Sequence, residues 1–267
     1  MNNPLVSIIT VVFNGEKHIE QTINSIIFQS YPHVEYIIIN GASTDGTLEI
    51  IKKHKKNITH LVSEKDTGIY NAMNKGLALA KGEIIGILNA DDYYYEKTIE
   101  LVVQAFINSK AEIIYGDLVK LRSFEGKNYF KELAPNISLM EKTMPIFHPA
   151  TFVKKTVYEK IGNFNEKYKL SADYDFIYRA FKNNIKFEYI PQPLTVFRVD
   201  GISSTNCQSY KEGYKILSSY GSPYDSQMRK LIFKCRIKNV VRFFGYLLLK
   251  LFGLKKWYER RLVEKWR

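Results

Sequence analysis

The sequence predicts an α/β protein built on a mixed, mainly parallel sheet that is flanked by helices. Apolar runs typical of buried strands alternate with segments of helical spacing throughout the first half of the chain. Only a few turn residues separate these segments, which is the pattern of βαβ units. With 267 residues, 45% of them hydrophobic, the chain can form one large domain with an appendage.

The elements of the first half follow one another at a regular pace. Tyr31-Pro32 ends the first helix, Asp66-Thr67 caps the third, and Gly82 closes it. Strands are predicted at Val6–Phe13, Glu35–Asn40, His60–Ser63, Glu83–Leu88 and Ile113–Gly116, and helices at Glu16–Ser30, Thr47–His54, Ile69–Ala80 and Glu96–Asn108.

After Asp117 the pattern becomes mixed. The sequence predicts a strand pair over Leu118–Leu133 that turns at Glu125-Gly126, and then a loop that contains Met144–Pro149. Helices near Val157–Ile161 and over Tyr174–Asn183 follow, and strands at Lys186–Ile190 and Leu194–Arg198 come last. We expect a domain over residues 1–220, divided near residue 117, and a separate tail over 221–267.

The positive charge of the chain is concentrated in the tail. From Met228 to Arg267 there are 13 lysines and arginines against two glutamates, a net +11 out of +12 for the whole chain. A basic tail on a nearly neutral body favours a polyanionic surface as its partner. The apolar block Val240–Phe252 argues against nucleic acid, and it is too short to span a bilayer.

Together with Trp257 and Trp266, the apolar block predicts an amphipathic helix that lies in the membrane interface. A helix packed on the core, or a homodimer contact, remains the alternative. The first ten residues do not resemble a cleaved signal peptide. The only two cysteines, Cys207 and Cys235, lack metal-ligand spacing and favour a reducing compartment.

A short polar segment, Asn89-Ala90-Asp91-Asp92, follows the predicted strand Glu83–Leu88. Adjacent carboxylates at the end of a buried strand are costly unless a metal ion or several donors compensate them. Ligands of open α/β sheets bind at this end of the strands, and hard metals share oxygen ligands with substrate phosphates. The alternative is an ordinary turn that opens the next helix.

Five motifs in sequence order resemble family 2 glycosyltransferases of the GT-A fold. One of them, Ser63–Gly76, also resembles a branch of that family that acts in bacterial surface-polysaccharide synthesis. Each motif is weak alone, and together they span residues 5 to 200. The motifs are Val6–Asn14, Ser43-Thr44-Asp45-Gly46-Thr47, Ser63–Gly76, Asn89-Ala90-Asp91-Asp92, and the pair formed by Ile146–Phe152 and Ala172-Asp173-Tyr174-Asp175.

The resemblance implies a nucleotide-sugar half at about residues 1–117 and an acceptor half at about 118–220. It implies a nucleotide-diphosphate sugar as donor, and Mn²⁺ or Mg²⁺ held by Asp91, alone or with Asp92, to neutralise the leaving diphosphate. Other donor contacts are implied for Thr10, Phe13, Asn14, Asn40, Asp66, Asn74, Asn89 and His148. A buried structural histidine is an equal alternative for His148.

Asp173 resembles the general base of the family, which would take the proton of the acceptor hydroxyl as it attacks with inversion. Asp173 could instead cap the helix that begins at Tyr174, and Asp175 is then the second candidate for the base. Three positions depart from relatives, which often carry Asp where this chain has Asn40, Asn71 and Asn89. The change at Asn40 alters the hydrogen bonds offered to a base.

The sequence thus predicts an inverting, metal-dependent glycosyltransferase that adds one sugar to a polyprenyl-diphosphate-linked acceptor. It would make O-antigen, capsule or exopolysaccharide from the inner face of the plasma membrane, where the tail binds anionic lipid. The alternatives are a non-catalytic nucleotide-sugar or membrane-binding module and, least favoured, a nucleic-acid-binding protein.

Overall fold

The computed structural model describes residues 3–199, 207–224, 229–237, 241 and 261. The strands are β1 (Val6–Val12), β2 (Val34–Asn40), β3 (His60–Ser63), β4 (Ile84–Asn89), β5 (Tyr93–Tyr94), β6 (Ile113–Phe124), β7 (Lys127–Leu133), β8 (Thr151–Lys154) and β9 (Phe187–Arg198). The helices are α1 (Ile19–Ile27), α2 (Thr47–Lys53), α3 (Ile69–Leu79), α4 (Thr98–Asn108), α5 (Lys155–Ile161), α6 (Ala172–Lys182) and α7 (Gln208–Ser219). Short 3₁₀ turns lie at Lys55–Asn57, Ile137–Leu139 and His148–Ala150.

One mixed sheet runs through the whole domain in the order β3-β2-β1-β4-β8-β6-β9-β5, and β7 pairs with β6. The first four strands are mutually parallel, as the βαβ pattern predicts. Beyond β4, the short strand β8 is antiparallel to both of its neighbours, and β6 and β9 are again parallel. The predicted mixed, mainly parallel α/β sheet is therefore confirmed.

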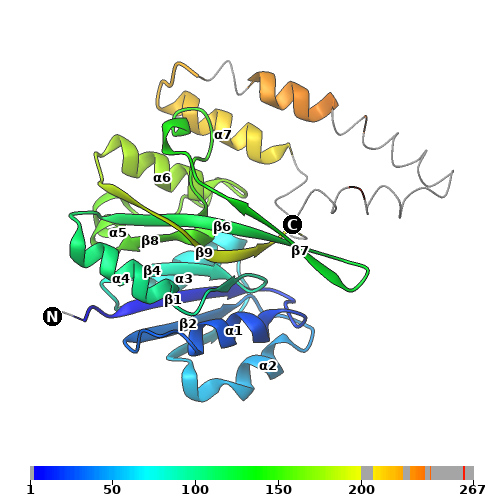
Figure 1. Ribbon diagram of the computed structural model, residues 1–267. Helices are drawn as coiled ribbons and strands as arrows, with labels where there is room; N and C mark the ends of the chain where they lie inside the picture. Colours follow the sequence, from blue (N-terminus) through cyan, green and yellow to red (C-terminus); the bar gives the residue numbers. More distant parts are fainter. Residues whose placement is uncertain (1–2, 200–206, 225–228, 238–240, 242–260, 262–267) are drawn as a thin grey trace.

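The sheet is the middle of three layers (Figure 1). Helices α1, α2 and α4 cover one face through an apolar cluster that includes Ile23 and Val102. Helices α3, α5, α6 and α7 cover the other face through a second cluster. Helix α3 packs especially close, because a Cβ on Gly76 would lie 2.4 Å from Ile9. Both faces of the central strands are buried, which explains why these strands are continuously apolar.

Two strands were not predicted from the sequence, and two predicted breaks are absent. β8 lies between β4 and β6, where we expected the end of a loop. β5 is only two residues long and pairs with β9. The strands expected at Ile113–Gly116 and from Leu118 are one strand, β6, with a bulge near Asp117. The strands expected on either side of Pro191 and Pro193 are likewise one strand, β9.

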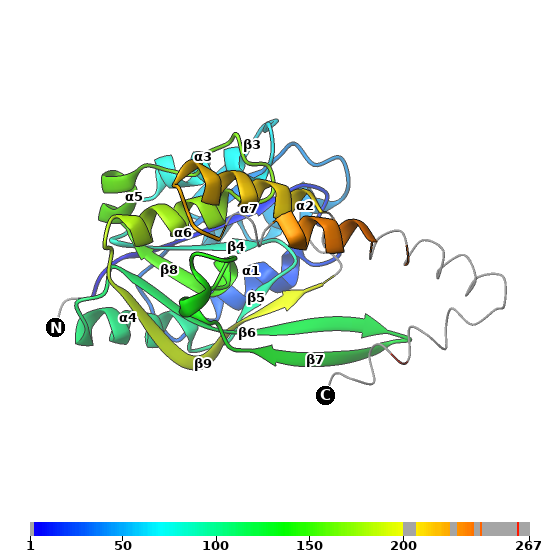
Figure 2. The same cartoon turned by 90° about the horizontal axis from the view of Figure 1, so that it is seen from above.

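The predicted hairpin with its turn at Glu125-Gly126 is confirmed. Both turn residues have positive φ, 49° and 74°, as a two-residue turn that follows the strand twist requires. The hairpin extends away from the body of the sheet (Figure 2). Most side chains of β7 are exposed, so this strand adds little to the core.

The start of the predicted tail contacts the body of the protein. Residues 229–237 are helical, and Arg229 donates a hydrogen bond of 2.6 Å to the Tyr214 hydroxyl on α7. Cys207 and Cys235 form a disulfide, which runs against the reducing compartment that the cysteine usage favoured. The apolar block 240–252 and both tryptophans lie outside the described residues, apart from Val241. No helix among the described residues is long and apolar enough to cross a membrane.

Candidate active site

The predicted donor residues gather where the parallel strands end. The strand registers place Asn40 beside Val12 on one side and beside Ser63 on the other, and Asn89 beside Val11. The loops that follow β1, β2, β3 and β4 therefore meet at one edge of the sheet. In open parallel sheets this edge is where ligands bind.

Asp92 lies at this edge with none of its surface exposed. Its Oδ1 accepts a hydrogen bond of 3.0 Å from the Arg198 backbone N–H, and its Oδ2 has no partner among the described residues. Burial raises the pKa of the Asp92 carboxyl well above its usual value, and the negative charge of Asp91 adds to the rise. Hydrogen bonds from Arg198 and the Asn89 side chain oppose the shift only in part. A cation beside Asp92 would stabilise its ionised form.

Two more buried polar atoms near Asp92 lack a partner within the described part of the chain. They are Asn89 Oδ1 and Arg198 Nε. The Arg198 guanidinium is held by Gln21 through a hydrogen bond of 2.5 Å. Several unsatisfied polar atoms in one buried place indicate a site that a polar ligand completes.

Arg198 was not identified from the sequence. It ends β9, 106 residues after Asp92, and reaches the site because β9 runs parallel to β6. The available signal was an arginine at the end of the apolar run Leu194–Phe197. That signal points to the site only if the direction of β9 in the sheet is known.

The acidic side chains near Asn89 fit a hard divalent cation. Asp91 is half-buried, and Asp92 and Asn89 present the unpartnered oxygens described above. Carboxylate and amide oxygens suit Mg²⁺ and Mn²⁺. Within the described ranges, no group of three or more His, Cys, Asp or Glu side chains is arranged to hold a metal.

Asn40 is buried and uses both ends of its amide inside the protein. Its Nδ2 donates to Ser63 Oγ at 2.9 Å, and its Oδ1 accepts from Ser43 Oγ at 2.5 Å. The Asp66 carboxylate lies directly over the next residue, since a Cβ on Gly41 would be 2.3 Å from Asp66 Oδ2. Asp66 thus brings a carboxylate to the strand end where this chain lacks the aspartate that many relatives carry.

The end of β1 contributes three predicted donor contacts that lie in different surroundings. Phe13 is 65% exposed at the edge, where it can contact a ligand. Asn14 has a φ of 52° and bridges to the next loop, accepting a hydrogen bond of 2.8 Å from Thr44 N. Thr10 is fully buried and accepts a hydrogen bond from the Tyr36 hydroxyl. The structure therefore gives Thr10 a place in the core and no surface for the predicted nucleotide contact.

The structure also places Asp173 near the ligand-binding edge. Asp173 is the second residue of α6, and its Oδ1 accepts a hydrogen bond of 2.9 Å from the Tyr70 hydroxyl at the start of α3. Asp175 is 3% exposed and pairs with Arg179 Nε at 2.9 Å. Arg179 also donates to the carbonyls of Ile161, Gly162 and Asn163. Asp175 is thus occupied within the fold, whereas Asp173 is half-buried beside the edge.

His148 lies on the same side as Asp173. Its ring meets the Phe164 ring edge-on, with the centroids 5.7 Å apart. Burial lowers the pKa of the His148 imidazole, and the Asp173 charge opposes this shift. The imidazole is therefore neutral at pH 7, and it lies near Asp173, the candidate general base. Contact of His148 with the donor phosphates stays a prediction.

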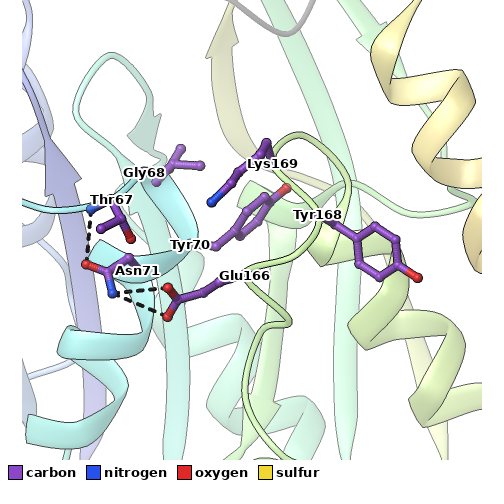
Figure 3. A pocket seen from close by; sticks show the side chains of 8 residues that line it. Thr67, Gly68, Tyr70, Asn71, Glu166, Tyr168 and Lys169 are labelled. Atoms are coloured by element: carbon purple, nitrogen blue, oxygen red, sulfur yellow. Dashed lines mark hydrogen bonds between the residues drawn. The ribbon is translucent and has the colours of Figure 1, made fainter.

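Asn74, a predicted donor contact, instead connects α3 to the segment before α6. Its amide exchanges two hydrogen bonds with the backbone of Phe164, at 3.0 and 3.1 Å, and donates to Glu166 at 2.9 Å. Asn71 also donates to the Glu166 carboxylate (Figure 3). These bonds leave the Asn74 amide little capacity to bind a donor.

A small cavity of about 10 Å³ lies beside these residues, enough for one water molecule. It is lined by Thr67, Gly68, Ile69, Tyr70, Asn71, Glu166, Tyr168 and Lys169 (Figure 3).

Comparison with known protein families matches residues 7–176 to glycosyl transferase family 2. A "PGL/p-HBAD biosynthesis glycosyltransferase" of Mycobacterium bovis is 33% identical over 188 residues, which cover 68% of this chain and 72% of the relative. An uncharacterized glycosyltransferase of Rickettsia prowazekii is 30% identical over 216 residues, which cover 76% of this chain and 67% of the relative.

Solved structures share the fold at lower identity. TarS 1–349 of S. aureus, in complex with UDP, superposes with a TM-score of 0.63 at 19% identity, covering 80% of this chain and 64% of that one. The mannosyltransferase PcManGT from Pyrobaculum calidifontis, in complex with GDP-Man and Mn²⁺, gives 0.63 at 18% identity, covering 96% and 84%. This likeness confirms the GT-A fold.

The family match covers most of the sheet together with Asp91, Asp92 and Asp173, and the curated relatives carry the same activity in their names. The chain therefore belongs to glycosyl transferase family 2 and is a glycosyltransferase.

Proposed function

We propose that this enzyme transfers one sugar, with inversion, from a nucleotide-diphosphate sugar to a polyprenyl-diphosphate-linked saccharide. The reaction would take place at the inner face of the plasma membrane, in the synthesis of a bacterial O-antigen, capsule or exopolysaccharide. It would use Mn²⁺ or Mg²⁺.

The observation that carries this proposal is the buried, unsatisfied oxygen cluster at the end of β4. Asp92 Oδ2 and Asn89 Oδ1 have no partner in the described part of the chain, and Asp91 lies between them in sequence. When bound there, a divalent cation supplies a positive charge that stabilises the diphosphate as it leaves. Arg198 supplies a second, permanent positive charge next to Asp92.

The acceptor side of the proposal depends on Asp173. The acceptor hydroxyl oxygen attacks the anomeric carbon, its proton passes to the Asp173 carboxylate, and the bond from that carbon to the diphosphate oxygen breaks. The leaving group takes the bonding electrons as a nucleoside diphosphate. One carboxylate acting in one displacement fits inversion of the anomeric centre.

The membrane part of the proposal depends on the C-terminal region. The helical residues 229–237 contain four cationic residues and no acidic residue. Leu231, Phe233 and Ile237 of this segment are exposed, with Phe233 the most exposed at 65%. Exposed apolar and cationic side chains together favour an anionic lipid surface.

A donor panel tests the chemistry. The full chain is incubated with a polyprenyl-diphosphate-linked saccharide and with UDP, GDP, CDP or TDP sugars, and release of nucleoside diphosphate is measured with Mn²⁺ and with chelator. We expect release with one donor class, its loss on chelation, and an inverted anomeric configuration in the product. Full release in the presence of chelator contradicts the metal, and a retained configuration contradicts the single displacement.

Vesicle flotation tests the membrane contact. Full-length protein is expected to float with vesicles that contain phosphatidylserine and to stay behind with purely phosphatidylcholine vesicles. Replacing Lys230, Lys234 and Arg236 with Gln should weaken flotation, because each basic residue near the surface contributes about 1 kcal/mol. The matched control replaces the exposed Lys52, Lys53 and Lys55 on the body. Equal effects of both triple variants contradict a specific contact.

The proposed cytoplasmic location needs its own test, because the structure contains the Cys207–Cys235 disulfide and disulfides are rare in a reducing cytosol. Cells are lysed into an alkylating reagent, and the oxidation state of Cys207 and Cys235 is read by mass spectrometry. A reduced pair supports the cytoplasmic face. A pair that is oxidised in the cell contradicts it.

A further inference from the structure

The hydroxyl of Tyr70 contacts Asp173 across 103 residues of sequence. The hydrogen bond measures 2.9 Å and joins the first turn of α3 to the first turn of α6. Tyr70 is 7% exposed, so its hydroxyl lies in partly dry surroundings, where a hydrogen bond to a carboxylate is strong. No motif in the sequence pairs these two residues.

Toward the ionised Asp173 carboxylate the Tyr70 hydroxyl is the donor, and its oxygen also interacts with the Asp173 backbone N–H. Burial raises the pKa of the Tyr70 phenol well above 10, and the Asp173 charge raises it further. The phenol therefore stays protonated at neutral pH. A protonated phenol that points at a carboxylate stabilises the ionised form, which is the form a general base requires.

The phenol is itself held in place by its surroundings. The Tyr70 ring packs against the Phe164 ring, with the centroids 5.6 Å apart, and Asn74 fixes the Phe164 backbone. On the far side, the Glu212 carboxylate of α7 accepts hydrogen bonds from the Lys169 and Leu170 N–H groups. The segment that leads into Asp173 is thus held by α3 on one side and α7 on the other.

We infer that Tyr70 is a positioning residue that orients the Asp173 carboxylate toward the acceptor hydroxyl. This inference rests on the proposed function, in which Asp173 accepts the acceptor proton. The Tyr70 hydrogen bond fixes Oδ1, so Oδ2 is the oxygen directed at the acceptor. Fixing one oxygen prevents the carboxylate from rotating and keeps the other oxygen in line with the attacking hydroxyl.

Other titratable groups surround the pair and are named here because the test is a pH profile. His148 lies on the 3₁₀ turn His148–Ala150, Glu166 and Lys169 precede α6, Asp175 and Arg179 follow Asp173 on α6, and Glu212 is on α7. Tyr70→Phe alters none of these groups. If one of them caused the acid limb of the kcat–pH profile, that limb would not move in this variant.

The test replaces Tyr70 with Phe, which removes one oxygen atom and keeps the ring packing on Phe164. Loss of the hydrogen bond should lower kcat about 10- to 100-fold and leave the KM for the donor within about twofold. The ionised carboxylate loses its donor, so the acid limb of the kcat profile should move to higher pH by about 0.5 to 1 unit.

Tyr174→Phe is the matched control. Tyr174 is also buried, and its hydroxyl donates a hydrogen bond of the same 2.9 Å length, but to the Met140 carbonyl. This variant should lose a similar amount of thermal stability, with the acid limb unmoved. Incorporating 3-fluorotyrosine at position 70 gives a stronger donor of nearly the same shape, so the acid limb should move to lower pH.

Asp173→Asn separates the role of Tyr70 from the role of Asp173 as general base. If this variant is inactive and Tyr70→Phe keeps the wild-type kcat and pH profile, the role of Tyr70 is overturned and the proposed function stands. If Asp173→Asn keeps wild-type turnover, the assignment of the base fails together with the role of Tyr70. Equal shifts of the acid limb in Tyr70→Phe and Tyr174→Phe also overturn the inference. If Tyr70→Phe does not fold, the fluorotyrosine profile decides.

Discussion

The two ends of the site differ in how completely their polar groups are satisfied. At the end of β4, Asn89 Oδ1, Asp92 Oδ2 and Arg198 Nε are buried without a partner among the described residues. Near α6, Asp173 and Glu166 accept hydrogen bonds from side chains of α3. The buried polar atoms named at the β4 end therefore lack hydrogen-bond partners within the described residues, whereas the carboxylates named near α6 have them.

Under the proposed function, this difference matches what each end would bind. Buried polar groups without a hydrogen-bond partner destabilise the protein, and a ligand that supplies the partner removes this cost. A general base needs the opposite, because its geometry has to be set before the acceptor arrives. We therefore expect changes at the β4 end to affect donor and metal binding, and changes near α6 to affect turnover.

The largest effects should come from removing the key carboxylates. Asp91→Ala and Asp173→Ala should each lower transfer by about 10³-fold or more. Calorimetric titration with Mn²⁺ and donor then distinguishes the two ends. Asp91→Ala should lose metal-dependent donor binding, and Asp173→Ala should keep it. Equal loss of donor binding in both variants would contradict the division of labour.

Breaking the buried Asp175–Arg179 pair tests how far the α6 end depends on its supports. Arg179→Met leaves a buried carboxylate unpaired and should destabilise the protein by about 3–5 kcal/mol. Burial already raises the pKa of the Asp175 carboxyl, and loss of Arg179 raises it further. A carboxyl whose pKa is raised by folding costs stability as pH rises above its unfolded pKa, about 3.9.

The loss of stability in Arg179→Met should therefore be larger at pH 7 than at pH 4, as measured by urea unfolding at both values. Adding Asp175→Leu should recover part of the loss, since no unpaired charge then remains. A loss that shrinks as pH rises would show that Asp175 is not the group responsible.

Gly41→Ala tests the end of β2, on the proposed donor side of the site, through a steric change. The new Cβ would lie 2.3 Å from Asp66 Oδ2, so the carboxylate has to move, at a cost of about 1–3 kcal/mol. The KM for the donor should rise about 10-fold with kcat little changed, if up to 1.4 kcal/mol appears in binding. In an Asp66→Ala background the same change should add nothing to KM. An additive effect would mean that Gly41 acts independently of Asp66.

The smallest effect concerns the contact between Asn71 and Glu166. Asn71→Asp restores the residue that relatives often carry, but it replaces an amide donor with a second carboxylate beside Glu166. We expect a loss of about 1 kcal/mol in unfolding free energy. Combining it with Glu166→Gln should restore the hydrogen bond, so the double variant should be more stable than Asn71→Asp alone. The wild type, Asn71→Asp, Glu166→Gln and the double variant form a double-mutant cycle, measured by urea unfolding.

Sequence periodicity predicted the donor half of the fold well, because its strands are buried on both faces and its helices carry a regular apolar stripe. The strands β5 and β8 were missed for a physical reason. β5 is two residues long and exists only because it pairs with Val196 and Thr195, about 100 residues later. β8 is four residues long, and its place between β4 and β6 is a long-range choice.

The site divides in the same way. Their roles stay predictions, but Asp91, Asp92 and Asp173 were identified as candidates because they stand in motifs that follow a strand or open a helix. Arg198 and Tyr70 were not, because their roles depend on contacts between segments more than 100 residues apart. Asn74 stays a predicted ligand contact, although the fold already uses its amide to hold Phe164.

The unbroken sheet limits how this enzyme can move. Hydrogen bonds join β4 to β8 and β8 to β6, so β1–β4 and the strands beyond them lie in one continuous sheet. Opening the site by rotating β1–β4 against the remaining strands would break the three registered pairs between β4 and β8. Substrate entry and product release would then depend on loops at the sheet edge, and slow turnover would report loop motion rather than domain closure.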